Sequence, residues 1–402
     1  DAAAARYWLG RKFSSWQGLA VAACVAVAGV AASWQLASYL QTAKPMPPAA
    51  RAASPADAMR NNDPAAKSTA QLPAVAAAPV PAKPAPEPAK ATAATPPDPA
   101  PRATPVAAAA APHTPDPLVR RGMLTAAAES GLKPGDRFKE CDTCPEMIVL
   151  PRGDFIMGSS ADQPGHEKDE TPVRKVTIAA RIAMARYAIT LEEYSTFAAV
   201  TGYRPGTGCR VHEGGKWVER AELSFRGPGF GQDGTHPVVC VNWNDARAYT
   251  DWMTARIGRE YRLPSEAERE FATRAGTTTA FWWGNDIAPA NAGYDWSHAF
   301  GKGPRGQTRQ GTHPVAAFAA NPWGLFQMHG NVSEWVEDCW NASYRSAPAD
   351  GAAWVTGDCR RRVLRGGSWG YAPKDLRSSY REGVTLTNRN FNFGFRVVRV
   401  LR

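Results

Sequence analysis

The sequence predicts a membrane-tethered protein whose single folded domain mixes short strands with helices. Three observations support this architecture: an uncharged apolar segment near the N-terminus, a long alanine- and proline-rich segment after it, and a C-terminal part in which strand-like patterns are followed by helix-like ones. We expect a cytoplasmic stub over residues 1–15, a membrane-spanning signal-anchor helix over 16–40, a disordered linker over 41–137 and the folded domain over 138–402.

The apolar segment has the length and flanks of a membrane anchor. Residues 14–41 carry no charge, and Gly18 to Leu40 is mostly Ala, Val and Leu, enough to cross about 30 Å of hydrocarbon as a helix. Arg6, Arg11 and Lys12 precede it, which favours a cytoplasmic N-terminus. We therefore expect a single-pass protein of a bacterial inner membrane with its C-terminal domain in the periplasm. A cleaved signal sequence and a buried core helix are the alternatives.

The linker lacks the residues that build a core. No Gly, Cys or aromatic residue occurs from Lys44 to Pro117, and the alternation of Ala with Pro favours an extended tether. The formal net charge of +10 comes partly from this linker and from the juxtamembrane segment. Because the folded part has no dense Lys/Arg cluster beside an aromatic platform, the sequence argues against nucleic-acid binding.

The cysteines agree with export. Cys24 lies in the predicted membrane helix, and the remaining six form an even set in a domain expected in an oxidising compartment. We expect three disulfides, and nearest-neighbour pairing, one of several possible connectivities, gives Cys141 with Cys144, Cys209 with Cys240, and Cys339 with Cys359. A redox-active Cys141-Asp-Thr-Cys144 is an alternative for the first pair. A zinc site would need a second pair of cysteines with suitable spacing, and the sequence has none.

Strands are expected first in the folded part. Met147 to Met157 alternates apolar and polar residues around a Pro-Arg-Gly turn, and Val173 to Ile178 is a second short strand. Beyond Gly276 the chain is rich in Gly, Pro, Asn and Trp, so we expect little regular structure there.

Three helices are expected between these regions, each with marked ends. The first has a capping box at its start, Thr190-Leu-Glu-Glu193. The first helix is expected to run from Thr190 to Gly202. The second begins at Asn242 or Asn244 and ends at Gly258, and the third begins at Ser265 and ends near Gly276.

Several short phrases follow one another in a fixed order along this part. The first are Phe155-Ile-Met-Gly-Ser159, His236-Pro-Val-Val239, Trp243-Asn-Asp-Ala246 and Tyr261-Arg-Leu-Pro-Ser-Glu-Ala-Glu268. The later ones are Trp323-Gly-Leu325, Gly330-Asn-Val-Ser-Glu-Trp335, Val363-Leu-Arg-Gly-Gly-Ser-Trp369 and Gly394-Phe-Arg396. Together they resemble the formylglycine-generating enzyme, or sulfatase-modifying factor, family over about two-thirds of the chain. The resemblance implies a compact α+β domain with little regular secondary structure, related to the C-type lectin fold.

The resemblance also implies a structural calcium ion. The matching ligands are the Gln327 side-chain oxygen, the Gly330 and Val332 carbonyls and the Glu334 carboxylate, all hard oxygen donors of the kind that calcium prefers. Gln327 replaces the usual Asn or Asp and weakens the expected site. Without the resemblance, Glu334 is interpreted as a surface or hydrogen-bonded acid.

Copper chemistry is not expected. Family members that oxidise a sulfatase cysteine to formylglycine bind Cu(I) through two cysteine thiolates. The corresponding positions here are Tyr371 and Leu376, and no cysteine occurs after Gly366. Ser368 matches the family serine beside that centre.

Polar and aromatic residues after Ser368 are expected to line the equivalent groove and to offer donors and acceptors to a ligand. These candidates are Trp369, Tyr371, Asp375, Arg377, Ser379, Arg381 and Asn390. For each, a structural role in tying loops together is the alternative, and Arg365 and Arg396 are expected to be structural.

Two functions are compatible with this sequence. The first is a binding or accessory (maturation) module that holds an exported protein, peptide or small molecule. The second is an oxidoreductase of the wider formylglycine-generating and non-haem iron family, acting on an exported protein or metabolite.

Overall fold

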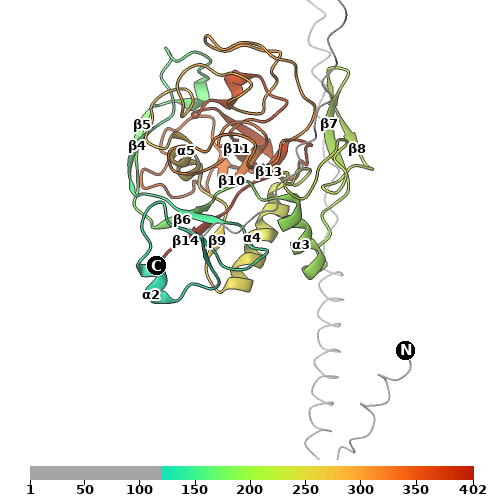
Figure 1. The fold of residues 1–402 in the computed structure, drawn as a ribbon. Helices are drawn as coiled ribbons and strands as arrows, with labels where there is room; N and C mark the ends of the chain where they lie inside the picture. Colours follow the sequence, from blue (N-terminus) through green and yellow to red (C-terminus); the bar gives the residue numbers. More distant parts are fainter. Residues whose placement is uncertain (1–118) are drawn as a thin grey trace, which may run out of the picture. The chain divides into compact units, whose positions relative to one another are not determined.

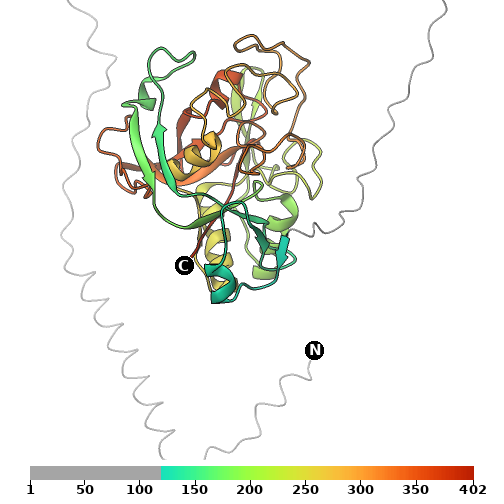
Figure 2. The ribbon, with the colours of Figure 1, turned by 60° about the vertical axis from the view of Figure 1, so that its left-hand side comes forward.

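The structure, a computed structural model, describes residues 119–402, which belong to one compact unit (Figures 1 and 2). A six-stranded sheet has the order β1-β2-β3-β6-β14-β9. Its strands are β1 (Val119–Arg121), β2 (Arg137–Lys139), β3 (Met147–Val149), β6 (Ile182–Ala185), β14 (Val398–Val400) and β9 (Tyr261–Arg262). All pairs except β1 with β2 are antiparallel. The last strand of the chain therefore lies inside the sheet.

A second sheet has the order β12-β11-β10-β13. It consists of β10 (Ser333–Trp340), β11 (Asp358–Arg365), β12 (Arg381–Thr385) and β13 (Phe393–Phe395). Two hairpins complete the strands, β4 (Gly153–Met157) with β5 (Arg174–Ile178), and β7 (Cys209–Glu213) with β8 (Lys216–Arg220). In Figure 1 the β7–β8 hairpin stands at one side of the domain, next to the end of α3.

The helices begin and end where their caps predict. They are α2 (Ala126–Ser130), α3 (Leu191–Thr201), α4 (Trp243–Ile257) and α5 (Glu266–Arg274), with 3-10 turns at Lys168–Glu170 and Pro373–Leu376. Capping boxes at Thr190, Asn242 and Ser265 open α3, α4 and α5. Gly202 and Gly258 end the first two in the left-handed conformation, whereas Ala275 takes that role after α5.

An aromatic core joins the helices to both sheets. Tyr194 of α3 and Tyr249 of α4 are fully buried, and the Tyr249 ring lies 5.4 Å from that of Phe395 in β13. Burying side chains of this size dominates the hydrophobic stabilisation of a domain. The core therefore fixes the C-terminal strands against the capped helices.

The expectation of little regular structure after Gly276 is correct for residues 277–332 and wrong for 333–400, which hold five strands. Strand β10 is nearly all buried, on both faces, so it shows no alternation of apolar with polar residues. Its polar members, such as Glu334 and Asp338, are satisfied by long-range partners that local periodicity does not reveal.

The folded part also begins earlier than Phe138. Residues 119–137, expected to be linker, form β1 and α2. Glu129 of α2 is buried and accepts two hydrogen bonds from Arg399, at 2.8 and 2.9 Å. The N-terminal segment is thus fixed by the other end of the chain. The predicted stub, membrane helix and most of the linker lie outside the described residues; within residues 119–402, no helix is long and apolar enough to span a bilayer.

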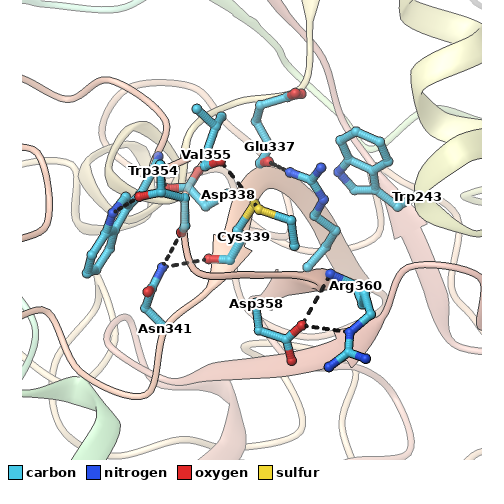
Figure 3. The surroundings of a disulfide bond; sticks show 12 residues. Trp243, Glu337, Asp338, Cys339, Asn341, Trp354, Val355, Asp358 and Arg360 are labelled. Atoms are coloured by element: carbon cyan, nitrogen blue, oxygen red, sulfur yellow. Dashed lines mark hydrogen bonds and ion pairs between the residues drawn. A yellow bond between two sulfur atoms is a disulfide. The ribbon is translucent and has the colours of Figure 1, made fainter.

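All three expected disulfides are confirmed, with the nearest-neighbour connectivity: Cys141–Cys144, Cys209–Cys240 and Cys339–Cys359. Figure 3 shows the third one, which joins β10 to the start of β11. Around it, Asn341 donates to the carbonyl of Cys339, and the Asp338 carboxylate accepts from the amide of Trp354 (Figure 3). These bonds hold the irregular segment between the two strands.

Candidate functional site

A cavity of about 630 Å³ opens between the β7–β8 hairpin, residues 369–375, strand β12 and residues 388–393. This volume suits a small-molecule or side-chain ligand. The turn before residue 369 requires glycine. Gly367 has φ of +67°, and a Cβ atom there would lie 2.5 Å from the Asp375 carbonyl. The close approach folds residues 369–375 back along the cavity wall.

Aromatic side chains form one wall of this cavity. Phe391 lies at its centre, with ring centroids 4.7 Å from Trp369 and 5.9 Å from Trp217, both in edge contacts. Trp217 comes from β8 and is 41% exposed, whereas Trp369 is 3% exposed. The wall is therefore rigid at its base and open to solvent at its rim.

Carboxyl groups also line the cavity. Tyr371 donates to a carboxylate oxygen of Glu382 at 2.8 Å. Burial raises the pKa of Glu382, and nearby Asp375 adds to the rise. Burial also raises the pKa of Asp375, although Lys374 forms an ion pair with it at 3.1 Å. Burial alone would raise the pKa of Asp295, but hydrogen bonds from Thr308 and Ser297 outweigh it and lower that pKa. Glu382 and Asp375 thus favour protons or cations more than exposed acids do.

Three buried polar atoms of the lining residues have no hydrogen-bond partner in the described part of the chain. They are the indole nitrogen Nε1 of Trp369 and the amide oxygens Oδ1 of Asn390 and Asn392. The three residues are 3%, 4% and 1% exposed. Unmet buried donors and acceptors cost free energy, so a ligand toward which these side chains turn would gain affinity by satisfying them.

The predicted groove residues divide into two groups. Trp369, Tyr371, Asp375 and Asn390 line the cavity. Arg377, Ser379 and Arg381 do not, which corrects the expectation for these three. Their side chains are buried in an internal ionic network and cannot reach a ligand.

That network shows why these three face inward. Arg377 binds both carboxylate oxygens of Glu170, at 2.6 and 2.9 Å, and donates to the Ser379 hydroxyl at 3.0 Å. Arg381 holds Glu266 in the same two-fold manner, at 2.6 and 2.7 Å. Arg365 and Arg396, expected to be structural, make similar buried pairs. Ser368 is fully buried beside the cavity, where its hydroxyl accepts from Asn392 at 2.7 Å.

Several lining residues were not predicted from the sequence: Arg210, His212, Trp217, Asp295, Glu382 and Phe391. One signal was available for Glu382. Neighbouring residues of a strand point to opposite faces, so Arg381 and Glu382 of β12 cannot both face one groove. Recognising 381–385 as a strand would have separated them.

The two positions implied for copper-binding thiols do not fit Cu(I). The Tyr371 hydroxyl is bonded to Glu382, and Leu376 is a buried apolar side chain. The six cysteines within residues 119–402 are all in disulfides, so this part of the chain holds no thiolate donor.

The residues implied for calcium also do not fit that ion as they lie. The Glu334 carboxylate is buried between two guanidinium groups, at 2.8 Å from Arg269 and 2.7 Å from Arg396. The Gln327 amide oxygen accepts from Asn331, and the Gly330 carbonyl accepts from the amide of Val332. A cation at Glu334 would be repelled by two fixed positive charges in a low-dielectric interior.

Removing calcium with a chelator tests whether the domain depends on a calcium ion at Glu334. We expect excess EDTA to leave the thermal unfolding midpoint of the full chain unchanged, because the arginines already neutralise Glu334. Differential scanning fluorimetry with EDTA, with EDTA plus calcium, and with magnesium as the ionic control measures this. A midpoint that falls with EDTA and returns only with calcium would contradict the expectation.

His329, the residue before Gly330, is expected to make the native domain less stable in acid. Its Nδ1 lies 2.6 Å from the Leu376 carbonyl, and its Nε2 accepts from the amide of Trp282 at 3.2 Å. Protonation would place a donor against that amide. Burial lowers the pKa of His329 to about 3, against about 6.5 in an unfolded chain.

Below about pH 6.5, His329 is therefore protonated in the unfolded chain but remains neutral in the native domain. We expect this one group to lower the free energy of unfolding by about 2 kcal/mol between pH 7 and pH 5. Urea unfolding at both pH values measures the loss, and His329→Gln should remove about that much of the pH dependence. The exposed His298→Gln is the control and should leave it unchanged.

Comparisons with known proteins agree with this architecture. A family model described as "Sulfatase-modifying factor enzyme 1-like domain" matches residues 134–401. A formylglycine-generating enzyme from Thermomonospora curvata is 35% identical over 56% of this chain and 82% of its own length. An inactive C-alpha-formylglycine-generating enzyme 2 from Bos taurus is 32% identical over 62% of this chain and 86% of its own. The structure of PvdO from Pseudomonas aeruginosa has 36% identity and a TM-score of 0.60, covering 67% of this chain and 100% of its own.

Proposed function

The chain belongs to the sulfatase-modifying factor enzyme 1-like domain family, and we propose that it is a ligand-binding or accessory module of that family that does not perform thiol-dependent copper oxidation. The observation that carries this proposal is the donor set. Tyr371 and Leu376 stand where the resemblance places the two cysteines, and neither side chain supplies a soft sulfur ligand.

The cavity supports a binding role. It is formed by an aromatic wall and a carboxyl-bearing wall, and three buried polar atoms of its lining have no partner within residues 119–402. A scaffold that had merely lost its activity would gain stability by filling such a space, since buried unpaired polar groups are costly. We infer that the pocket is maintained for a ligand.

We also propose that this pocket works in the periplasm, on an exported peptide, protein or small molecule. The three disulfides support an oxidising compartment. The apolar segment over 16–40 supports a membrane tether. Alkaline phosphatase fused after Arg402 should be active in cells and β-galactosidase inactive; the reverse result would place the domain in the cytoplasm.

A binding assay and an oxidation assay on the full chain test the main proposal together. We expect a screen of small fragments and short peptides to give saturable binding that Trp369→Ala abolishes. Trp354→Ala is the matched control, because this half-buried tryptophan does not line the cavity. With Cu(I) and a Cys-x-Pro-x-Arg peptide, we expect neither oxygen uptake nor aldehyde formation.

Turnover of that peptide would overturn the proposal. Oxygen uptake with another exported substrate, together with a stoichiometric redox metal, would instead support the second function, an oxidoreductase of the wider family.

A further inference from the structure

Within residues 119–402 the domain matches every fully buried glutamate with an arginine. The pairs are Glu129 and Glu140 with Arg399, Glu170 with Arg377, Glu266 with Arg381, Glu268 with Arg262, Glu270 with Arg365, and Glu334 with Arg396. The reason is electrostatic: a carboxylate removed from water is costly unless a cation meets it.

Glu382, which is half-buried, does not belong to this fully buried set and has no arginine partner in the described part of the chain. It lines the cavity, its carboxylate accepts one hydrogen bond from Tyr371, and it forms no ion pair with any described residue. Arg361, which also lines the cavity, turns its guanidinium to the Gly383 carbonyl at 3.1 Å and lies over the Trp340 ring. A half-buried carboxylate thus faces a ligand-sized space and has no ion-pair partner among the described residues.

We propose that the cavity recognises a cation, a primary ammonium or guanidinium group on an aromatic or apolar carrier, which pairs with Glu382. This inference rests on the proposed binding function and names the ligand class. The ligand cation would take the place that an arginine takes beside each buried glutamate.

The rest of the cavity fits such a ligand. Trp369, Phe391 and Trp217 present aromatic surface to the carrier and allow cation–π contact. The unpaired oxygens of Asn390 and Asn392 lie just beneath the cavity surface, and a rotation of either side chain would bring an acceptor to an ammonium or guanidinium group, which has donors to spare. The unpaired Trp369 nitrogen calls for one acceptor elsewhere on the ligand.

The remaining cations do not neutralise the site. Arg210 extends over the Trp217 ring, with its guanidinium carbon 6.0 Å from the ring centroid. Two further acids, Asp375 and Asp295, also line the cavity. Lys374 pairs with Asp375 and with Glu167, and is not itself a lining residue.

Three probes of one size test the inference by calorimetry on the full chain: benzylamine, benzyl alcohol and benzoate. We expect benzylamine to bind at least ten-fold more tightly than the other two. Because this comparison uses the unsubstituted chain, it does not depend on any variant folding. Glu382→Gln, whose amide oxygen can still accept from Tyr371, should abolish the preference and leave the alcohol unaffected. Glu260→Gln, an exposed acid that precedes β9 and does not line the cavity, is the control.

The outcomes separate the two proposals. If benzyl alcohol or benzoate binds in a Trp369-dependent manner and benzylamine gains nothing from Glu382, the cation inference fails and the binding function stands. If no probe binds and the fragment screen is also empty, both fail. A ten-fold preference for benzylamine that survives Glu382→Gln would overturn the assignment to Glu382.

Discussion

Replacing Glu334 with glutamine is expected to lower the free energy of unfolding by about 3–5 kcal/mol, the range found when one partner of a buried ion pair is removed. Glu334 and its two partners, Arg269 and Arg396, are each at most 1% exposed. Its carboxylate accepts from both guanidinium groups. Glutamine keeps the shape of the side chain and removes its charge, so two buried cations remain without an anion.

The titration of Glu334 has the same origin. Burial alone would raise its pKa, but Arg269 and Arg396 outweigh burial and lower it. A lowered carboxyl pKa means that this stabilisation is present above the pKa of an unfolded glutamate and is lost as the pH falls through the native value. Glu334→Gln should therefore show a smaller loss of stability on acidification than the unsubstituted chain.

Urea unfolding of the full chain at pH 7 measures the loss. Glu213→Gln is the control, because Glu213 forms an ion pair with Arg220 at the surface, where solvent screens the attraction and such pairs contribute little to stability. A triple variant with methionine at Glu334, Arg269 and Arg396 should be less damaged than Glu334→Gln, since it leaves no unpaired charge. Equal stability of Glu334→Gln and Glu213→Gln would show that the carboxylate does not hold the two arginines.

The phrases that signal the family are largely this ionic network. Tyr261-Arg-Leu-Pro-Ser-Glu-Ala-Glu268 supplies Glu266 and Glu268, which pair with Arg381 and Arg262, and Gly394-Phe-Arg396 supplies the partner of Glu334. Sequence phrases of this kind specify the scaffold. They carry little information about what the cavity binds, because only one residue of these phrases, Trp369, lines the cavity.

Local features were predicted well because their physics is local. A capping box such as Thr190 with Glu193 involves residues three apart, and both of its hydrogen bonds are present. The nearest-neighbour disulfides were confirmed, and they too join cysteines that are close in the sequence. Each of these features can be read without knowing the fold.

Long-range features were not predicted. Strand β10 pairs with β13, which lies about sixty residues later in the chain. The residue pattern of β10 does not predict this pairing. The cavity draws Trp217, Asp295 and Glu382 from three distant segments. Arg377 and Arg381 were placed in the groove because they follow Ser368 in the sequence, but their partners Glu170 and Glu266 lie more than a hundred residues earlier. These distant partners determine the direction in which each arginine side chain points.

The Cys209–Cys240 disulfide is expected to stabilise the domain and also to shape the cavity. It closes a loop of 31 residues, for which the loss of unfolded-state entropy corresponds to about 4 kcal/mol. Both cysteines adjoin a cavity wall. The amide of Cys240 donates to the Asn390 carbonyl, and Arg210, next to Cys209, exchanges backbone hydrogen bonds with Arg389 and Phe391.

A Cys209→Ser/Cys240→Ser variant should therefore lose about 4 kcal/mol of unfolding free energy and also release the wall. We expect faster amide hydrogen exchange in β7, β8 and residues 389–391, and weaker binding of any ligand that depends on Trp369. The matched control is Cys339→Ser/Cys359→Ser. Its disulfide has a sequence separation of 20 and comparable entropy, but neither of its cysteines bonds through its backbone to residues 389–391.

The control should lose similar stability without faster exchange in β7, β8 or residues 389–391. Since both variants remove one disulfide, a difference between them reports on position and not on general loosening. If both accelerate exchange around the cavity equally, the wall is held by global stability; if neither does, the hydrogen bonds of Arg210 and Cys240 suffice without the covalent link. Only a selective effect of the first variant supports the disulfide as the part that fixes the cavity.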